Sequence, residues 1–381
     1  MENRNNIEIK LGRAQVESYS RRRGSSLISV IIVNFQGSRF ILGCLRSVLS
    51  SDYPSFEVLV VDNASTDGSA ELIEEEFEKD PRVIIIRNSV NVGFAKANNQ
   101  AAKISHGEFL LFLNADTRTD ESSMRRLAEA LRSDDRIAVA QPKLLLIDTD
   151  PPRIDSTGDL MDPYGNGYRR GVGLVDRGQF DDKVDEIFSA RGAAMIVKRD
   201  IFIKVGMFDE DFFLYLEDVD LCWRIRLADK SIRYVPNAVV FHAAAGSRDQ
   251  AMLARAWFHV VKNQLAMIVK NYSWRHLPKS LAGRLLCYAI VAIYYPVILA
   301  KTHGRRDNAG FLTRPAPTPQ MARAVLGGMF WNLRSLRQTL SKRSRIQTFI
   351  RRASDEAISS YMEKRDPLAN LLRQIDPAGL T

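Results

Sequence analysis

The sequence predicts an α/β fold built on a parallel sheet, and two observations support this prediction. Apolar, β-branched runs of the kind found in strands buried on both faces recur through the first third of the chain: LISVIIVNF, FEVLVVD, RVIIIRN and FLLFLN. Helical patterns separate successive runs, around residues 40–50, 70–79 and 95–105. Strands and helices that alternate with short connections indicate right-handed parallel crossovers.

The next part of the chain completes this domain. Residues 154–180 are rich in Gly, Asp and Arg, so we expect long loops or short strands there. ARGAAMIVKRDIF predicts a short strand and a helix, and RYVPNAVVFH predicts a further strand. YLEDVDLCWR predicts the start of a helix, because acids are favoured in a first turn. Asp220 and Arg224 have the i,i+4 spacing of an ion pair.

Polar residues stand where three of the predicted strands end. They are Asn34, Asp62 with Asn63, and Asn114 with Asp116. Ligands of parallel α/β sheets bind at the carboxyl ends of the strands, so these tips predict a binding site. A carboxylate such as that of Asp116 is suited to hold Mg²⁺ or Mn²⁺ against a diphosphate, although a turn after a strand uses the same residue types.

Charge divides the chain into two parts. Residues 251–353 contain 18 Lys and Arg residues against one acid, whereas the remainder holds 36 basic and 44 acidic residues. The basic part therefore predicts an anionic partner, either nucleic acid or membrane phosphate. The N-terminus lacks the apolar core of a secretory signal, and the three scattered cysteines fit a reducing cytoplasm.

The composition of the basic part favours a membrane as its anionic partner. Residues 285–300 form an uncharged run that contains Pro296, which suggests a buried, interfacial or re-entrant helix. A Pro-rich hinge at 314–320 precedes GGMFWNLRSLRQTLSKRSRIQTFIRR, in which Leu and aromatic residues are mixed with Arg and Lys. This mixture is typical of a helix on an anionic membrane surface. A basic helix that packs its apolar stripe on the core remains the alternative.

Taken in order, the motifs resemble the family 2 inverting glycosyltransferases of the GT-A fold, over residues 27–250. The matching segments are SVIIVNF, VVDNASTDGS, NVGFAKANN, LNADT, GAAMIVKRDIF, VGMFDEDFFLYLEDVDLCWR and VPNAVVFH. The bacterial rhamnosyltransferase-like branch, which builds cell-surface polysaccharides, is the most similar. The resemblance implies a mixed sheet flanked by helices, followed by a basic helical C-terminal region.

The resemblance also implies a donor site. Asp62 would contact the nucleoside, with Asn34 in the same pocket and with Asn91, Gly93 and Asn98 in support. LNADT takes the place of the family's DxD motif.

The resemblance also implies metal and acceptor roles for residues at matching positions of this sequence. Because Asn114 replaces the first acid of the DxD motif, Asp116 would be the main carboxylate for Mg²⁺ or Mn²⁺, and His242 would close the metal–diphosphate site. Asp218 would be the general base of an in-line displacement. Glu217 would orient the acceptor or hold the loop.

We therefore expect an inverting sugar transferase at the cytoplasmic face of the cell membrane. The donor would be TDP- or UDP-linked, with L-rhamnose or another deoxysugar preferred, and the acceptor lipid-linked or a polysaccharide. Two alternatives are a sugar-nucleotide nucleotidyltransferase and a catalytically silent lipid-binding relative. Nucleic acid is not expected as a partner, and homo-oligomer formation is left open. The expected parts are a mobile basic arm, a catalytic domain, a membrane-associating helical region and a tail, at residues 1–26, 27–250, 251–353 and 354–381.

Overall fold

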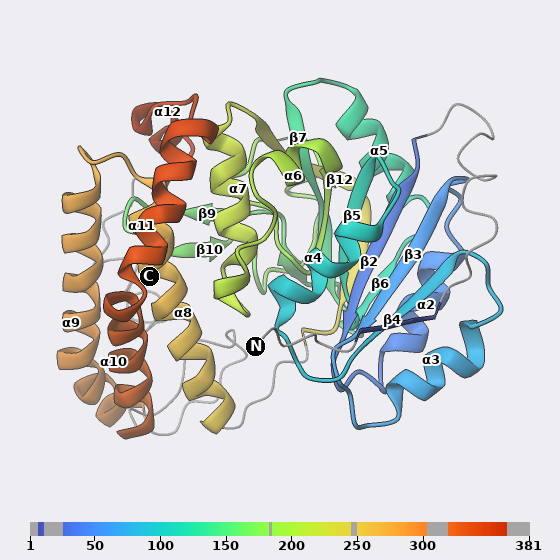
Figure 1. The fold of residues 1–381 in the computed structure, drawn as a ribbon, viewed down its shortest axis with the longest axis horizontal. Coiled ribbons are helices and arrows are strands. Elements are labelled where there is room, and N and C mark those ends of the chain that lie inside the picture. The colour runs from blue at the N-terminus through green and yellow to red at the C-terminus, as the bar shows by residue number, and fades with distance from the viewer. Residues whose placement is uncertain (1–6, 11–25, 183–184, 245–249, 303–318, 364–381) are drawn as a thin grey trace. The chain divides into compact units, whose positions relative to one another are not determined.

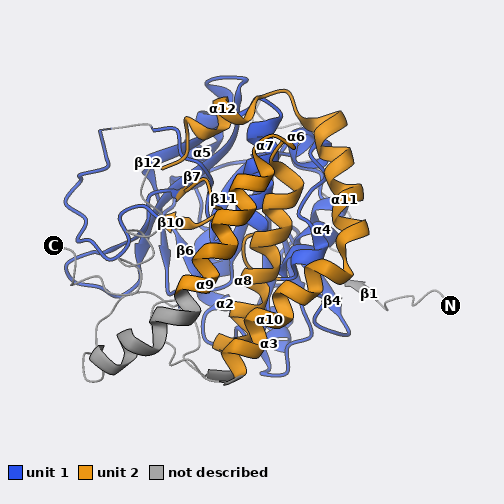
Figure 2. Ribbon diagram, turned by 90° about the vertical axis from the view of Figure 1, so that its left-hand side faces the viewer, with its two compact units in different colours: residues 1–159, 169–213, 217–244 blue, residues 160–168, 214–216, 245–381 orange. Residues whose placement is uncertain are grey.

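The computed structural model describes residues 7–10, 26–182, 185–244, 250–302 and 319–363 (Figure 1). The chain divides into two compact units, coloured separately in Figure 2. The first unit consists of residues 1–159, 169–213 and 217–244, and the second of residues 160–168, 214–216 and 245–381.

A mixed sheet of ten strands organises the described part of the first unit. Its strand order is β1-β4-β3-β2-β5-β11-β7-β12-β6, with β8 paired to β7. The strands are β1 (Ile7–Lys10), β2 (Ile28–Asn34), β3 (Phe56–Asp62), β4 (Val83–Asn88), β5 (Phe109–Asn114), β6 (Thr117–Thr119), β7 (Ile137–Leu146), β8 (Ile154–Ser156), β11 (Ala194–Lys198) and β12 (Ser231–His242). Two further strands, β9 (Asp159–Met161) and β10 (Gly167–Arg169), pair with each other.

Helices follow the strands, and the sequence predicts all but those at 123–132 and 210–212. They are α2 (Ile41–Leu49), α3 (Ser69–Phe77), α4 (Phe94–Ile104), α5 (Ser123–Arg132), α6 (Arg199–Lys204), the short turn η1 (Glu210–Phe212) and α7 (Glu217–Leu227). Strands β2 to β5 are mutually parallel, which confirms the predicted crossovers. The sheet becomes mixed at β11, which is antiparallel to both β5 and β7.

The core lies between the sheet and helices on both of its faces. Ile28, Val30 and Ile32 point to the face covered by α2, α3 and α5, since side chains alternate along a strand. On the other face, Phe112 packs against Phe202 of α6, with ring centroids 5.2 Å apart. Burying each such side chain contributes about 1.5–3 kcal/mol to folding, so the continuous apolar runs account for the sheet.

Strand register brings the polar tips together. In the β2–β3 pair Asn34 lies opposite Asp62, and in the β2–β5 pair Val33 lies opposite Asn114. The three predicted tips therefore end at one edge of the sheet, as parallel pairing requires.

In three places the observed elements and compact units are divided differently from the predicted domains, which stay predictions. Part of the arm at 1–26 is a strand, because Ile7–Lys10 pair antiparallel with β4. The second unit takes 160–168 and 214–216 from the predicted catalytic domain and begins again at 245. The predicted tail at 354–381 begins as structure, with α12 (Asp355–Ser359). Most of the predicted Pro-rich hinge lies outside the described residues.

The second unit is helical in its described part, apart from its share of β9 and β10. Its further elements are α8 (Gln250–Asn271), α9 (Leu277–Thr302), α10 (Pro319–Arg334), α11 (Leu336–Arg345) and η2 (Ile346–Ile350). The uncharged run at 285–300 falls within α9. No helix in the described ranges is both long enough and apolar enough to cross a bilayer.

Basic and amide side chains close the C-terminal end of α8. The last carbonyls of a helix have no intrahelical donor, so other groups must satisfy them. Arg343 donates to the carbonyls of Val269 and Tyr272, and Gln347 donates to the carbonyl of Asn271 at 3.1 Å. Part of the basic charge in this region therefore serves folding.

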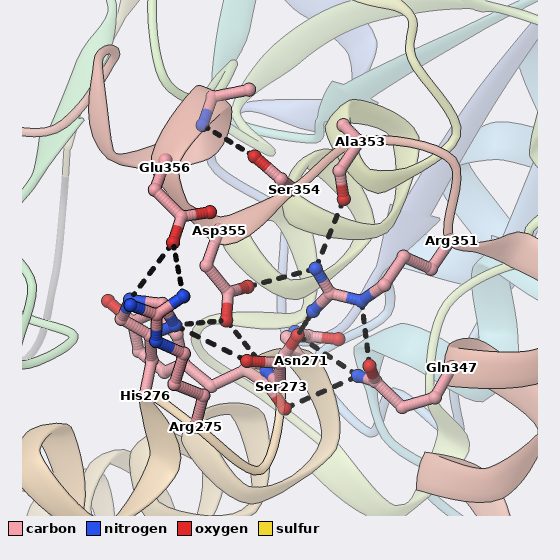
Figure 3. A network of polar contacts seen from close by, with 12 residues as sticks. Asn271, Ser273, Arg275, His276, Gln347, Arg351, Ala353, Ser354, Asp355 and Glu356 are labelled. Carbon is pink, nitrogen blue, oxygen red and sulfur yellow. Dashed lines mark hydrogen bonds and ion pairs between the residues drawn. The ribbon is translucent and has the colours of Figure 1, made fainter.

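Arg351 connects this cap to α12. It donates to the carbonyl of Asn271, and its Nη1 lies 2.9 Å from Asp355 Oδ1 (Figure 3). Asp355 is buried and also accepts a hydrogen bond from the Ser273 amide at 2.9 Å. The carboxylate therefore depends on its partners to offset its desolvation.

We predict that Arg351→Gln destabilises the second unit by about 2–4 kcal/mol, because the buried Asp355 carboxylate loses its guanidinium partner. Arg352, which is exposed, provides the matched control, and Arg352→Gln should change stability by less than about 0.5 kcal/mol. Urea unfolding of the full chain, followed by tryptophan fluorescence, measures both. Equal effects of the two variants would contradict a structural role for the Arg351–Asp355 pair.

Candidate active site

Hydrogen bonds connect the polar residues at the ends of β2 and β3. Asn34 Nδ2 donates to Asp62 Oδ1 at 2.8 Å and to Ser69 Oγ at 2.8 Å. The Ser65 amide donates to Asp62 Oδ2 at 3.1 Å. Asn34 Oδ1 is buried and has no hydrogen-bond partner among the described residues. The ends of β2 and β3 are thus held in place, while the amide oxygen of Asn34 accepts no hydrogen bond from the described residues.

The three supporting residues shape the neighbouring loop. Asn91 Oδ1 accepts from Asn63 Nδ2 and from the Gly93 amide, both at 2.9 Å. Gly93 has φ +89°, and a Cβ at this position would lie 2.5 Å from the Phe213 ring, so only glycine fits. Asn98 is buried and donates to the Phe94 carbonyl of its own helix at 2.9 Å. These contacts give Gly93 and Asn98 framework roles.

Asp116 and His242 meet beside these tips. β12 ends at His242 and pairs there with β6, the strand that follows Asp116. His242 Nε2 lies 3.3 Å from Asp116 Oδ1 and 3.5 Å from Asn114 Nδ2. The pairing of two short strand ends therefore places a carboxylate and an imidazole in contact, although they are far apart in sequence.

Asp155 holds the other side of the imidazole. His242 Nδ1 lies 2.9 Å from Asp155 Oδ2, and Asp155 Oδ1 accepts from Arg169 at 2.5 Å. Burial alone would raise the pKa of Asp155, but the hydrogen bond from His242 and the nearby guanidinium groups hold that pKa below its usual range. Burial lowers the pKa of His242, yet Asp116 and Asp155 together raise this pKa to about 9.

The acid pair at the start of α7 splits into two unlike groups. Glu217 is buried, and burial together with the charge of Asp218 raises its pKa to about 8. Its Oε2 has no hydrogen-bond partner among the described residues. Asp218 is half-buried, and its Oδ2 accepts from the Gly192 amide at 2.7 Å. Asp220, in contrast, is a buried partner of Arg224 at 2.9 Å, which confirms the predicted pair.

A half-buried arginine, Arg191, links the two groups of acids. Arg191 Nη1 lies 3.4 Å from Asp159 Oδ2, and Arg191 Nε lies 3.9 Å from Asp155 Oδ2. Burial raises the pKa of Asp159 to about 6, although Arg191 opposes this shift. Because Arg191 directly precedes Gly192, contacts run continuously from Asp116 through His242 and Asp155 to the partner of Asp218.

Sequence reasoning missed four members of this network: Asp155, Asp159, Arg169 and Arg191. For Asp155, Asp159 and Arg169 the only signal is the density of Asp, Arg and Gly at 154–180, which predicts long loops or short strands. Arg191 lies beyond that segment. Acids in a loop-like, polar segment are ordinarily solvated, so sequence alone did not indicate that Asp155 and Asp159 are buried.

Comparison with known proteins agrees with this geometry. Residues 29–204 match the model of the family described as "Glycosyl transferase family 2". Residues 29–204 thus carry a family 2 glycosyltransferase domain. It is 28% identical over 213 residues to the poly-beta-1,6-N-acetyl-D-glucosamine synthase of Staphylococcus epidermidis. That alignment covers 56% of this chain and 48% of the relative, so the chain spans about half the length of the curated relatives it matches.

Solved structures share the fold of the glycosyltransferase domain. GalNAc-T7, solved with UDP, GalNAc and Mn²⁺, matches with a TM-score of 0.53 and 16% identity over 68% of this chain and 52% of its own. The mannosyltransferase PcManGT of Pyrobaculum calidifontis, solved with GDP-Man and Mn²⁺, matches with a TM-score of 0.52 and 16% identity over 87% and 90%. The predicted fold and family are thus confirmed, whereas the rhamnosyltransferase-like branch stays a prediction.

The pKa shifts of Glu217 and His242 predict that stability falls as pH rises. Glu217 keeps its proton in the folded state up to about pH 8, while the unfolded chain releases it near pH 4.5. His242 likewise holds its proton to about pH 9 rather than 6.5. Folding therefore loses stability from pH 4.5 to 8 through Glu217 and from 6.5 to 9 through His242.

Denaturant midpoints at pH 5, 7 and 9 measure this effect. We expect Glu217→Gln to flatten the decline between pH 5 and pH 8, because the amide does not titrate. Glu121, an exposed residue, supplies the control Glu121→Gln, which should leave the wild-type slope unchanged. If Glu217→Gln leaves the wild-type slope between pH 5 and pH 7 unchanged, Glu217 ionises normally.

Proposed function

We propose that this chain transfers a sugar from a nucleoside diphosphate donor to an acceptor hydroxyl with inversion, using Asp218 as the general base. One observation carries the proposal. Asp116 and His242 form a carboxylate–imidazole pair suited to a diphosphate-bound cation. The contacts of His242 with Asp155 lead from this pair to the Gly192 amide, which positions the half-buried carboxylate of Asp218. An in-line displacement requires these two functions on opposite sides of one sugar.

Asp62 and Asn34 support a nucleoside site. Their hydrogen bonds hold the Asp62 carboxylate at the strand tips, where parallel sheets bind ligands. We propose a TDP-linked deoxysugar as donor, on the family resemblance. A UDP-linked N-acetylhexosamine is the second candidate, because the Staphylococcus relative is named for a polymer of N-acetyl-D-glucosamine and GalNAc-T7 was solved with UDP.

Asp116 and His242 fit a divalent cation. Two ligands held about 2.1 Å from one ion at right angles lie roughly 3 Å apart, close to the observed 3.3 Å. The described ranges contain no group of three or more acidic, His or Cys side chains arranged for a metal. Mg²⁺ and Mn²⁺ fit such a sparse site, because substrate phosphates and water complete their coordination. When bound, the cation would neutralise the leaving diphosphate.

Asp155 would keep His242 ready for this role. With Nδ1 directed at Asp155, the imidazole presents Nε2 toward Asp116. Partners of this kind orient a histidine ligand and increase its basicity.

The different environments of the acid pair support the assignment of the base. Burial and the charge of Asp218 keep the proton on Glu217 near pH 7 by raising its pKa. Two backbone amides, of Gly192 and Val219, fix the Asp218 carboxylate at 2.7 and 2.8 Å. Asp218 can then accept the proton of the acceptor hydroxyl while neutral Glu217 donates a hydrogen bond that orients the acceptor.

The acceptor and the site of action follow from the wider context. We propose a lipid-linked or polysaccharide acceptor, in keeping with the polysaccharide synthase to which the chain is similar. We also propose that the chain works at the inner face of the cell membrane, because its C-terminal region is strongly basic.

Asp218→Asn should abolish sugar transfer, with a loss of kcat of about 10²–10⁴-fold, because the amide cannot accept the proton. Binding of TDP, UDP and GDP, measured by calorimetry with Mn²⁺, should be unchanged, and the tightest of the three identifies the donor class. Asp200→Asn, at an exposed acid of α6, should retain full activity. Full activity of Asp218→Asn would refute the assignment of the base.

Asp155→Asn should weaken Mn²⁺ binding by about 10–100-fold, because the imidazole loses its orienting carboxylate. Electron paramagnetic resonance of Mn²⁺ in the presence of excess nucleoside diphosphate reports this without any turnover. Asp148→Asn, at an exposed position, is the control and should bind Mn²⁺ as the wild type does. If the wild type does not bind Mn²⁺, the proposed metal site is wrong. If Asp155→Asn binds Mn²⁺ as tightly as the wild type does, the orienting role of Asp155 is wrong.

A further inference from the structure

Helix α10 contacts α8 through a glycine and leaves several of its large apolar side chains exposed. A surface helix normally buries its large apolar side chains and exposes small or polar ones. In α10 the residue closest to α8 is Gly328, where an added Cβ would lie 2.9 Å from the Phe258 carbonyl oxygen and 3.1 Å from Val261 Cβ. The close approach of these two backbones leaves no room for a side chain at position 328.

A hydrogen bond holds this orientation. Asn332, one turn after Gly328, donates through Nδ2 to the Lys262 carbonyl of α8 at 3.0 Å. Val325 and Met329 pack at the border of the same contact, against the cluster around Val261. Because both Gly328 and Asn332 are bound to α8, the helix cannot rotate about its axis without losing both contacts.

The outer face therefore carries the large apolar residues. Leu326, Phe330 and Leu333 are 65%, 64% and 71% exposed. Their spacing of four and three residues aligns them along one stripe. Leu336 and Leu340, also exposed, follow in α11. We call Leu326, Phe330 and Leu333 the α10 stripe.

Positive charge surrounds the α10 stripe. Residues 319–345, which include α10 and α11, contain six Lys and Arg residues and no acid. Arg323, Arg334 and Arg337 are exposed. At helical spacing, Arg334 and Arg337 lie three or four residues from members of the stripe. An apolar stripe bordered by arginines, with no acid, complements an apolar layer beneath anionic head groups.

We propose that the α10 stripe and its arginines insert into the head-group region of an anionic lipid bilayer. A second copy of this chain fits less well, because a two-fold contact would bring like charges together without acids to pair them. Nucleic acid would use the arginines but leave the three apolar side chains in water. The proposal specifies the surface for the membrane location proposed above, and its test involves no sugar transfer.

The test is co-sedimentation of the full chain with vesicles of phosphatidylcholine containing 30% phosphatidylglycerol, and with phosphatidylcholine alone. We expect binding to the anionic vesicles that weakens with added salt, and little binding to the neutral ones. The triple variant L326Q/F330Q/L333Q should reduce the partition coefficient at least about tenfold, since it removes three apolar insertions. R334Q/R337Q should reduce binding to anionic vesicles only.

Matched exposed residues of the first unit provide the control. Leu174 and Ile203 are 52% and 46% exposed, and L174Q/I203Q should partition as the wild type does. The α10 stripe is exposed, so the triple variant should keep the wild-type denaturant midpoint. Absence of binding to anionic vesicles, or an unchanged partition of the triple variant, would overturn the proposal. So would a dimer in solution that the triple variant dissociates. Donor binding by calorimetry tests the glycosyltransferase site separately.

Discussion

The burial of Asp155 is the constraint on which the arrangement of the site depends. A carboxylate without access to water requires cations and hydrogen-bond donors around it. Asp155 obtains them from His242 at the end of β12, from Arg169 at the end of β10 and from Arg191 ahead of β11. Each of these residues comes from a different element. The buried Asp155 carboxylate is stable only with these partners around it, and they lie at or near the ends of several strands.

The same network separates the two carboxyl groups of α7. Adjacent acids in water would both be ionised at neutral pH, but Glu217 is buried beside Asp218 and keeps its proton. Asp218 remains half-buried and is held by the Gly192 amide. A Cβ on Gly192 would approach Asp218 Oδ2 to 3.2 Å, so a small residue suits this position. Two neighbouring residues of the same chemical class thus obtain different roles from their surroundings.

The C-terminal unit uses its positive charge in two ways. Arg343 and Arg351 are directed inward and satisfy the carbonyls at the end of α8. Arg334 and Arg337 are exposed, next to the α10 stripe. Composition alone cannot separate these uses, because a helix-capping arginine and a membrane-facing arginine are the same residue at the level of sequence. The close contact between Gly328 and α8 decides which face of α10 is outward.

Local patterns in the sequence determined the strands, the helices, their parallel order and the polar tips at Asn34, Asp62 and Asn114. Such features depend on neighbours a few residues apart, so the sequence carries them directly. The order of the motifs also sufficed for the family.

Only the tertiary structure decided the remaining features. It shows that Asp155 and Arg191 belong to the site and that Gly93 lies against the ring of Phe213. It also shows that α10 exposes Leu326, Phe330 and Leu333. Desolvation, charge pairing and close backbone contact arise between residues distant in the chain. Their strength depends on burial, which no local pattern specifies.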